Sequence, residues 1–411
     1  MARKMKDSGI EWIGEIPEGW EIVPVRSCFD EVRTKNTDGQ EQNALQFKSG
    51  NIISKTNFNA SMDDYVADTI TNYTVVLPDT VMINGLNLNY DFKSLRVALV
   101  KEKGVITSAY LAIFPDRKKI FPQYATYLFK GYETKMAFHN MGAGIRKTLG
   151  YKEFKNQPLL LPSKEEQNKI SAYLDSKCSH IDIMLSKIRS SIEEYKKLKQ
   201  AVITQAVTTL NCPNVKLKYL MDIIVDCPHE TPIYTFTGNY LVIRTSDQSL
   251  ASLRCDEYMY RLDEAEYKKR TRRLTLDKDD IVYGREGSWG LACLVPQSNK
   301  YCLGQRVMQF RCNTRLLYPK YAMYALNSET VYMQGALDTI GSTAPHVNIS
   351  TICNYLLPVP ALTEQKEITN YLDAKCAEID RLIAKKEQLV KELESYKKSL
   401  IYEVVTGKRE V

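Results

Sequence analysis

The sequence lacks the short motifs that mark nucleotide-driven and zinc enzymes. It has no GxxxxGK[ST] phosphate loop, no GxGxxG opening a helix and no GxSxG turn. No HExxH motif or other metal-ligand spacing is formed by its four histidines, His139, His180, His229 and His346. These absences count against both enzyme classes, and we expect no catalytic residue, metal or bound cofactor in this chain.

Long apolar runs are also missing. No stretch of about 18 apolar residues could span a membrane, and the N-terminus has no apolar signal-peptide core. Ten cysteines are scattered without a CxxC pair, which predicts reduced thiols in a cytoplasmic protein. The net charge of +7 indicates an anionic partner only weakly, so clusters of basic residues have to carry any such argument.

A long internal repeat is the main feature that the sequence does contain. The stretch from Pro162 recurs from Pro360 without a gap, at an offset of 198 residues. The matched identities include Glu166/Glu364, Gln167/Gln365, Ile170/Ile368, Tyr173/Tyr371, Leu174/Leu372, Asp175/Asp373, Lys177/Lys375, Cys178/Cys376, Ile181/Ile379, Asp182/Asp380 and Lys187/Lys385.

Each copy predicts a helix of roughly 45 residues, or about 65 Å at 1.5 Å per residue. Apolar residues recur at heptad positions a and d, which is typical of a coiled coil. The predicted seam comprises Ile170, Leu174, Ile181, Ile188, Leu198, Ile368, Leu372, Ile379, Leu382, Leu389 and Leu393. Lys177 and Lys375 fall at d, where matched polar residues fix register. The alternative is two unrelated amphipathic helices, each packed on its own domain.

Mixed α and β patterns precede each repeat. Asp279–Tyr283 matches Asp79–Ile83 at an offset of 200, and YPKYAMYAL from Tyr318 matches FPQYATYLF from Phe121. The globular domains are therefore also duplicated, with looser identity. We predict an α+β chain with a pseudo-twofold repeat, divided into an N-terminal domain (1–160), a helix (161–210), a C-terminal domain (211–358) and a second helix (359–411).

The C-terminal domain holds the strongest basic cluster. Phosphate contacts are predicted for Lys268, Lys269, Arg270, Arg272 and Arg273, although a solvated charged turn has the same composition. The GREGSWG stretch could present an arginine to a guanine edge, or form only a structural turn. Further candidate contacts in this domain are Arg285, Ser288, Trp289, Gln305, Arg306 and His346.

The N-terminal domain has an asparagine-rich stretch between two predicted strands. Asparagine can read adenine through paired hydrogen bonds, but such stretches also form plain turns. The candidate contacts here are Asn84, Asn87, Asn89, Tyr90, Lys93 and Arg96. In GAGIRKT, Arg146 and Lys147 match the place of His346 and are predicted to contact the DNA backbone.

The repeated EQ..I..YLD.K...ID helix and the WIGEIPEGW lead-in together resemble the specificity subunit of type I restriction–modification systems. The resemblance covers essentially the whole chain. It implies two target recognition domains that each read half of a split, asymmetric site in double-stranded DNA. It implies that the two helices pack antiparallel as a spacer and dock two adenine methyltransferase subunits, which motor–nuclease subunits join. S-adenosylmethionine, ATP and Mg²⁺ would belong to those partners.

Two other classes remain open at this point. A solitary DNA nuclease or methyltransferase would need a site that the motifs do not reveal. A coiled-coil adaptor without a nucleic-acid role would leave the basic cluster unexplained.

Overall fold

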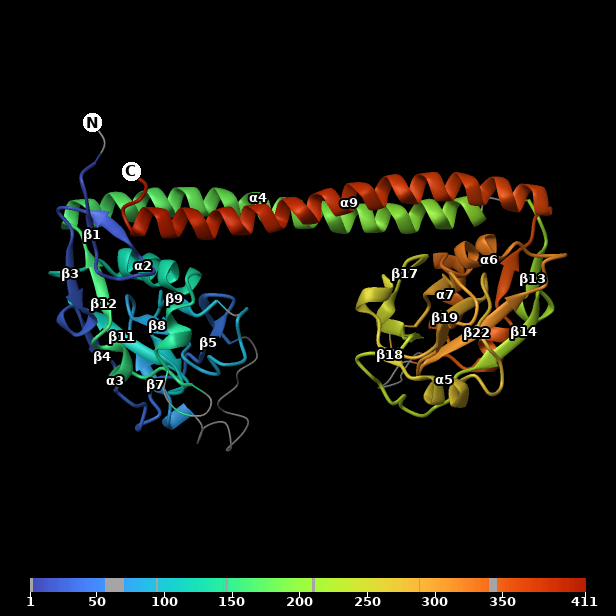
Figure 1. The fold of residues 1–411 in the computed structure, drawn as a ribbon, viewed down its shortest axis with the longest axis horizontal. Coiled ribbons are helices and arrows are strands. Elements are labelled where there is room, and N and C mark those ends of the chain that lie inside the picture. The colour runs from blue at the N-terminus through green and yellow to red at the C-terminus, as the bar shows by residue number, and fades with distance from the viewer. Residues whose placement is uncertain are drawn as a thin grey trace. The chain divides into compact units, whose positions relative to one another are not determined.

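The chain forms two compact units in a computed structural model that describes residues 3–55, 70–93, 95–142, 144, 147–208, 211–287, 289–339 and 346–411. Residues 1–187 and 389–411 belong to the first unit, and residues 188–388 to the second. Each unit combines one mixed α/β domain with parts of the two long helices, α4 (Lys164–Thr208) and α9 (Leu362–Val405) (Figure 1). The predicted α+β class with two long helices is confirmed.

The first unit is built on a four-stranded antiparallel sheet of order β4-β11-β8-β9. Its strands are β4 (Phe29–Glu31), β11 (Leu111–Pro115), β8 (Val81–Ile83) and β9 (Val97–Leu99). Helix α2 (Pro122–Thr134) packs on β8 and β9, and β3 (Glu21–Pro24) pairs with β12 (Pro158–Leu161). Smaller elements are β1 (Met5–Asp7), β2 (Glu15–Pro17), η1 (Val25–Ser27), β5 (Leu45–Lys48), β6 (Asn51–Ser54), β7 (Thr74–Val76), β10 (Gly104–Ile106), η2 (Ala137–Asn140) and α3 (Tyr151–Phe154).

The second unit repeats this plan with the sheet order β14-β22-β19-β20. Its strands are β14 (Met221–Asp226), β22 (Val307–Cys312), β19 (Ile281–Gly284) and β20 (Ala292–Leu294). Helix α6 (Pro319–Leu326) stands where α2 stands, and β13 (Asn214–Lys216) pairs with β23 (Leu356–Pro358). The other elements are η3 (Leu217–Tyr219), β15 (Tyr240–Ile243), η4 (Thr245–Asp247), β16 (Gln248–Ser249), β17 (Ser252–Leu253), η5 (Asp256–Tyr258), β18 (Arg261–Leu262), α5 (Glu264–Arg270), β21 (Tyr301–Leu303), α7 (Glu329–Ala336) and α8 (Ile349–Cys353).

A matched glutamine fixes each domain to the first turn of the long helix that follows it. The side-chain oxygen of Gln167 accepts the backbone N–H of Phe121 at 2.8 Å, and that of Gln365 accepts the N–H of Tyr318 at 2.7 Å. Each amide nitrogen donates to two backbone carbonyls. Because both side chains are fully buried, satisfying every group is what makes the amide tolerable there.

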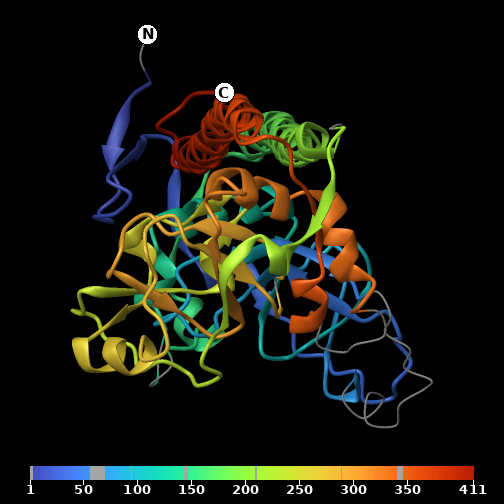
Figure 2. The ribbon, with the colours of Figure 1, turned by 90° about the vertical axis from the view of Figure 1, so that its right-hand side faces the viewer.

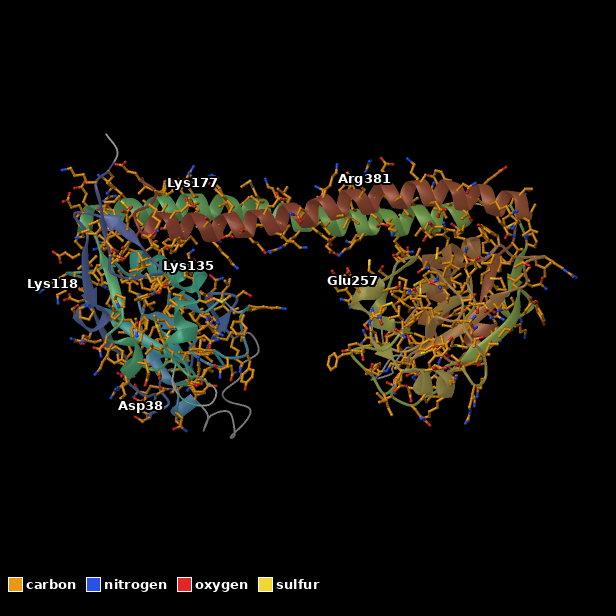
Figure 3. The ribbon with its side chains drawn as sticks, viewed as in Figure 1. Asp38, Lys118, Lys135, Lys177, Glu257 and Arg381 are labelled. Carbon is orange, nitrogen blue, oxygen red and sulfur yellow. The ribbon has the colours of Figure 1, made fainter. Side chains whose placement is uncertain are left out.

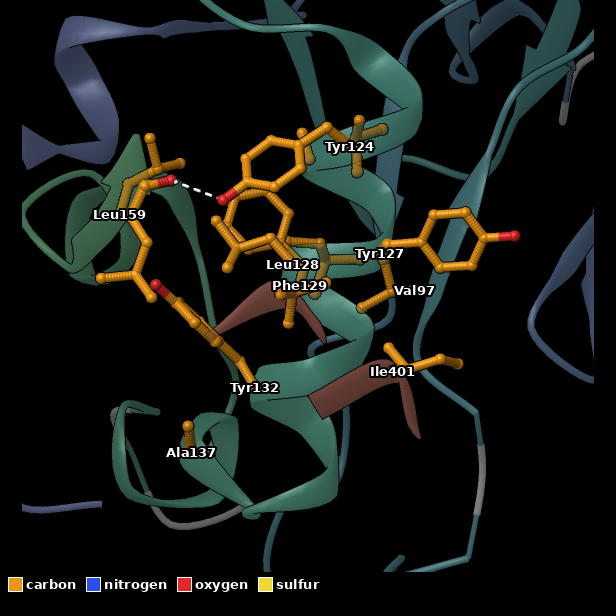
Figure 4. Packing of buried hydrophobic residues seen from close by; sticks show 14 of the residues in the cluster. Val97, Tyr124, Tyr127, Leu128, Phe129, Tyr132, Ala137, Leu159 and Ile401 are labelled. Atoms are coloured by element: carbon orange, nitrogen blue, oxygen red, sulfur yellow. Dashed lines mark hydrogen bonds between the residues drawn. The ribbon is translucent and has the colours of Figure 1, made fainter. Parts of the chain in front are cut away.

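The core of the first unit joins its domain to both long helices (Figure 4). Tyr124 and Tyr132 of α2 face β12, and the Tyr124 hydroxyl donates to the Leu160 carbonyl at 3.0 Å. Ile401 of α9 belongs to the same buried cluster. Burial raises the pKa of both tyrosine hydroxyls above their usual range, so they stay neutral.

The tryptophan-bearing lead-in packs against the helix ends of the first unit. Trp12 accepts a hydrogen bond from the Tyr402 hydroxyl at its carbonyl, 2.7 Å away, and Trp20 donates its indole N–H to Glu166 at 2.9 Å. Gly407 ends α9 with φ +71°, and a Cβ there would lie 2.3 Å from Pro17. Glycine is therefore required where α9 meets the lead-in.

Helices α4 and α9 lie side by side and run antiparallel within each unit (Figures 1 and 2). In the first unit, Lys397 of α9 pairs with Asp182 of α4 at 2.6 Å. In the second unit, Lys199 of α4 pairs with Asp380 of α9 at 2.8 Å. Both lysines and both aspartates are matched at the offset of 198, so the two ion pairs are one interaction used twice.

The buried seam differs from the predicted one at most of its d positions, although the d residue Ile170 is buried as predicted. Leu198 and Leu389 are 48% and 43% exposed, and Lys177 projects away from the helix pair (Figure 3). The seam positions of α4 lie one residue later, at Cys178, Leu185, Ile192 and Lys199, and alternate with the predicted a positions. The prediction failed because several of the flanking residues are apolar as well, so spacings of three and four both look plausible.

Lys199 is consequently the seam lysine, in place of Lys177. Its side chain is 8% exposed, and both oxygens of the Asp380 carboxylate lie within 2.9 Å of its ammonium nitrogen. A buried ammonium without this partner would be costly. The pair therefore disfavours any register that separates it from Asp380.

We expect Lys199→Ala to lower the free energy of unfolding of the second unit by about 1–2 kcal/mol, a moderate value because Asp380 is half exposed. Lys177→Ala, on the exposed face of the same helix, is the matched control and should change it by less than about 0.5 kcal/mol. Urea unfolding of both variants measures the difference. Equal losses would contradict the assigned seam.

Candidate nucleic-acid interface

In the second unit, several predicted contact residues meet at one edge of the central sheet. The edge lies where β14 and β19 end and β22 begins. Arg285 donates its backbone N–H to the carbonyl of Arg306 at 2.9 Å, and Gln305 donates its side-chain amide to the Thr231 hydroxyl at 3.0 Å. An isolated bridge pairs Glu286 with His346. The edge thus collects residues that are up to 115 positions apart in the sequence.

The exposed members of this edge have polar side chains suited to base or phosphate contacts. Arg306 and His346 are exposed, and Gln305 is half-buried. Arg306 adopts φ +70°, an unusual left-handed conformation for a residue with a side chain. Guanidinium and amide groups are the donors that read purine edges in the major groove.

Arg285 and Trp289 are less available than predicted. The Arg285 guanidinium is 9% exposed and lies 2.7 Å from Glu286 and 3.3 Å from Asp226. Trp289 stacks on Tyr332 with ring centres 4.4 Å apart and is 9% exposed. The direct contact predicted for Trp289 is thus replaced by a role in the core. Ser288 lies outside the described residues.

Only some residues of the basic cluster Lys268, Lys269, Arg270, Arg272 and Arg273 are exposed without a carboxylate partner among the described residues. Lys268 pairs with Glu264 at 2.6 Å and Lys269 with Glu230 at 2.8 Å, contacts that raise the pKa of both lysines. Arg272 and Arg273 are exposed.

Arg270 is buried, which corrects the prediction that it contacts phosphates. Adjacent residues of α5 point about 100° apart on a helix, so a run of basic residues cannot face one way.

In the first unit, the asparagine-rich stretch forms a loop after β8. Asn87 adopts φ +53°, and Tyr90 is 74% exposed. The Leu88 N–H donates to the carbonyl of Lys147 at 3.2 Å, so this loop meets the glycine-rich one. Asn87, Tyr90 and Lys93 are exposed, while Asn84, Asn89 and Lys147 are half-buried. Arg146 lies outside the described residues.

Arg96 does not reach the surface. It is 1% exposed, and its guanidinium donates to the carbonyls of Asn84 and Leu86 at 2.9 Å each. The contact predicted for it with DNA is corrected to an internal one, because both terminal nitrogens of its guanidinium donate to carbonyls of the loop.

Sequence reasoning missed several residues that shape these surfaces. Asp226, which ends β14, contacts Arg285, and Thr231, in the loop after it, contacts Gln305; no local motif marks either residue. Lys199 and Lys397 carried a usable signal, because both they and their aspartate partners are matched in the repeat.

A family model described as the type I restriction modification DNA specificity domain matches residues 226–393. Two curated relatives from Methanocaldococcus jannaschii, the putative type I restriction enzyme MjaX specificity subunit and the type I restriction enzyme MjaVIII specificity subunit, are each 22% identical. Both alignments cover 96% of this chain, with 95% and 93% of the relatives. A chain from a structural study of the assembly and conformational transition of a type I R-M system has a TM-score of 0.68, with 16% identity over 96% of this chain and 99% of that one.

The fold consists of two related α/β domains, each packed with parts of the same two long helices. Residues 226–393 thus match a type I DNA specificity domain, and nearly the whole chain is similar to specificity subunits of type I restriction enzymes. Within the described ranges, no group of three or more His, Cys, Asp or Glu residues could hold a metal ion. No helix in that same part of the chain is long and apolar enough to cross a membrane.

The protonation of Glu133, in α2, makes the stability of the first unit depend on pH. Its carboxylate accepts the Arg96 backbone N–H at 2.7 Å, and burial raises the pKa of Glu133 to about 7. The folded state therefore holds a proton between the ordinary pKa of 4.5 and about 7 that the unfolded state has released. Stability of the first unit should fall as pH rises through this window.

We expect Glu133→Gln to remove this falling limb, because glutamine can still accept the Arg96 N–H but does not titrate. Thermal unfolding of the wild type and the variant from pH 4.5 to 8 provides the comparison. The exposed carboxylate variant Glu165→Gln should leave the limb in place. A limb of unchanged depth in Glu133→Gln would show that another group causes it.

Proposed function

We propose that the chain reads a split, asymmetric DNA site, one half with each domain. The observation that carries this proposal is one backbone frame with different side chains. Leu149 donates its N–H to the carbonyl of Gly85 at 2.9 Å, and Val347 donates to that of Arg285 at 3.1 Å. The two bonds are equivalent in the repeat, yet the exposed residues near them differ, with Asn87, Tyr90 and Lys93 in the first unit and Arg306 and His346 in the second. Similar domains with different edges suit two different half-sites.

Within each half-site, exposed loop residues would share positioning and readout. The exposed Arg272 and Arg273, and the half-buried Lys147, are suited to phosphates, which set orientation without sequence information. Asn87 in the first unit and Arg306 in the second are suited to purine edges. These assignments rest on exposure and donor chemistry at the loops described above.

The helix pair would set the spacing of the half-sites. Its seam and its repeated lysine–aspartate pairs favour one antiparallel register, and each domain is fixed to a helix start through a buried glutamine. A packed helix pair holds a separation better than a flexible linker can.

The outer faces of the helices would dock the modification subunits. Large apolar residues are exposed on both helices, outside the seam, and exposed apolar surface of this kind suits a protein partner. These residues are Ile183, Met184, Leu198, Tyr371, Leu389 and Tyr396. In this proposal two adenine methyltransferase subunits bind S-adenosylmethionine, motor–nuclease subunits use ATP and Mg²⁺, and this chain contributes recognition without catalysis.

Exchanging residues 21–155 for the corresponding domain of another specificity subunit should change one half-site and leave the other intact, because each edge is built within its own unit. Sequencing of methylated adenines in cells that carry the modification subunits provides the measurement. A change in both half-sites would refute independent reading.

Inserting one heptad after Ile188 and another after the matched Lys386 should lengthen the spacer by about 10 Å, or about 3 base pairs at 3.4 Å each. The half-site sequences should stay the same, because the insertions leave both domains untouched. Insertion in α4 alone is the control and should abolish methylation by mispairing the seam. Retention of the original spacing in the double insertion would sink the spacer model.

A further inference from the structure

Arg270 lies inside the second unit, beneath the two loops that form its recognition edge. Its guanidinium donates to the carbonyl of Leu303 at 3.1 Å and to that of Glu230 at 3.0 Å, with Pro228 at 3.3 Å. The Pro228 and Glu230 carbonyls belong to the loop after β14, and Leu303 ends β21 (Tyr301–Leu303), directly before the loop at 304–306 that leads into β22. One side chain therefore ties together the segments that present Thr231, Gln305 and Arg306.

Arg96 has the same relation to the loop after β8 in the first unit. It donates to the carbonyls of Asn84, Leu86 and Asp91, the last at 2.5 Å. His139 contacts the same Asp91 carbonyl at 3.2 Å. The span between these carbonyls contains Asn87, Asn89 and Tyr90, so the guanidinium closes the loop from within.

The two arginines are not equivalents in the repeat. Arg96 precedes β9, whereas Arg270 ends α5, and neither position matches the other at the offset of 198. The two domains thus have the same arrangement, a buried arginine bonded to loop carbonyls, at different places in the sequence. The arrangement is therefore not part of the internal repeat.

The loops need support of this kind. Arg306 and Asn87 hold left-handed backbone conformations, which persist only where the surroundings compensate their strain. A guanidinium suits the task because it offers five donors in a rigid plane. The nearest paired carboxylates stand off at 4.0 Å (Glu266) and 3.6 Å (Asp91), so the carbonyls make the closest contacts.

We propose that Arg270 and Arg96 are positioning residues, each of which holds the recognition loop of its own domain in the DNA-reading conformation without touching DNA. The inference rests on the proposed function for what the loops read. It does not rest on that function for how the loops are held. Loss of either guanidinium should reduce sequence discrimination at one half-site only.

The test uses the full chain assembled with its modification subunits and DNA in which either half-site is scrambled. Arg270→Met and Arg270→Lys should each reduce discrimination at the half-site of the second domain by about tenfold or more. Discrimination at the other half-site, and the dependence of binding on salt, should not change. Arg96→Met and Arg96→Lys should give the reverse pattern. Lysine should not substitute for arginine here, because it keeps the positive charge but lacks the planar guanidinium that donates to several carbonyls at once.

Arg272→Ala is the matched control from the same basic run, and as a phosphate contact it should weaken both DNAs equally and lower the salt slope by about one. A similar drop in slope for Arg270→Met would overturn the proposal in favour of direct contact, and unchanged discrimination would overturn it outright. Amide hydrogen exchange at residues 226–231 and 303–306 should rise in Arg270→Lys. If the wild type discriminated neither half-site, the proposed function would fail, while this exchange result would still decide whether Arg270 holds the loops.

Discussion

Two lysine–aspartate pairs determine how the long helices lie against each other. Lys199 with Asp380 and Lys397 with Asp182 cross the seam in the two units, at matched places in the repeat. A slip of one heptad would separate both lysines from their carboxylates and leave the buried Lys199 ammonium without its partner, which is costly. The register decides which domain surface meets each helix end, and the Gln167 and Gln365 contacts then orient the domains.

On this scaffold the two domains share a frame and differ in content. The same sheet order and equivalent backbone bonds recur, whereas the edges carry different side chains. Buried arginines support both edges although the sequence places them differently. Interior support of this kind lets exposed loop residues vary without disturbing the sheet, because the loop backbone is held by its carbonyls and not by the residues that would read DNA.

Much of the fold could be predicted from the sequence because the repeat displays it twice. The strand Val81–Ile83 and its match near Ile281 form as expected, and both helices follow the repeated prolines. The predicted seam was wrong by one residue at alternate positions. Apolar residues such as Met184 and Leu185 are adjacent, and only Leu185 is buried. Burial of Arg96 and Arg270 could not be predicted, since a basic residue next to a loop reads as surface until tertiary contacts supply carbonyl partners.

Mapping methylated adenines in host DNA, with and without this chain and in the presence of type I modification subunits, tests the central claim most directly. The account predicts a split motif with two short specified halves and a constant unspecified gap, which disappears when the chain is removed. A methylation pattern that is unchanged by removal, or a single uninterrupted motif, would contradict the claim that two domains on a helical spacer read the site together.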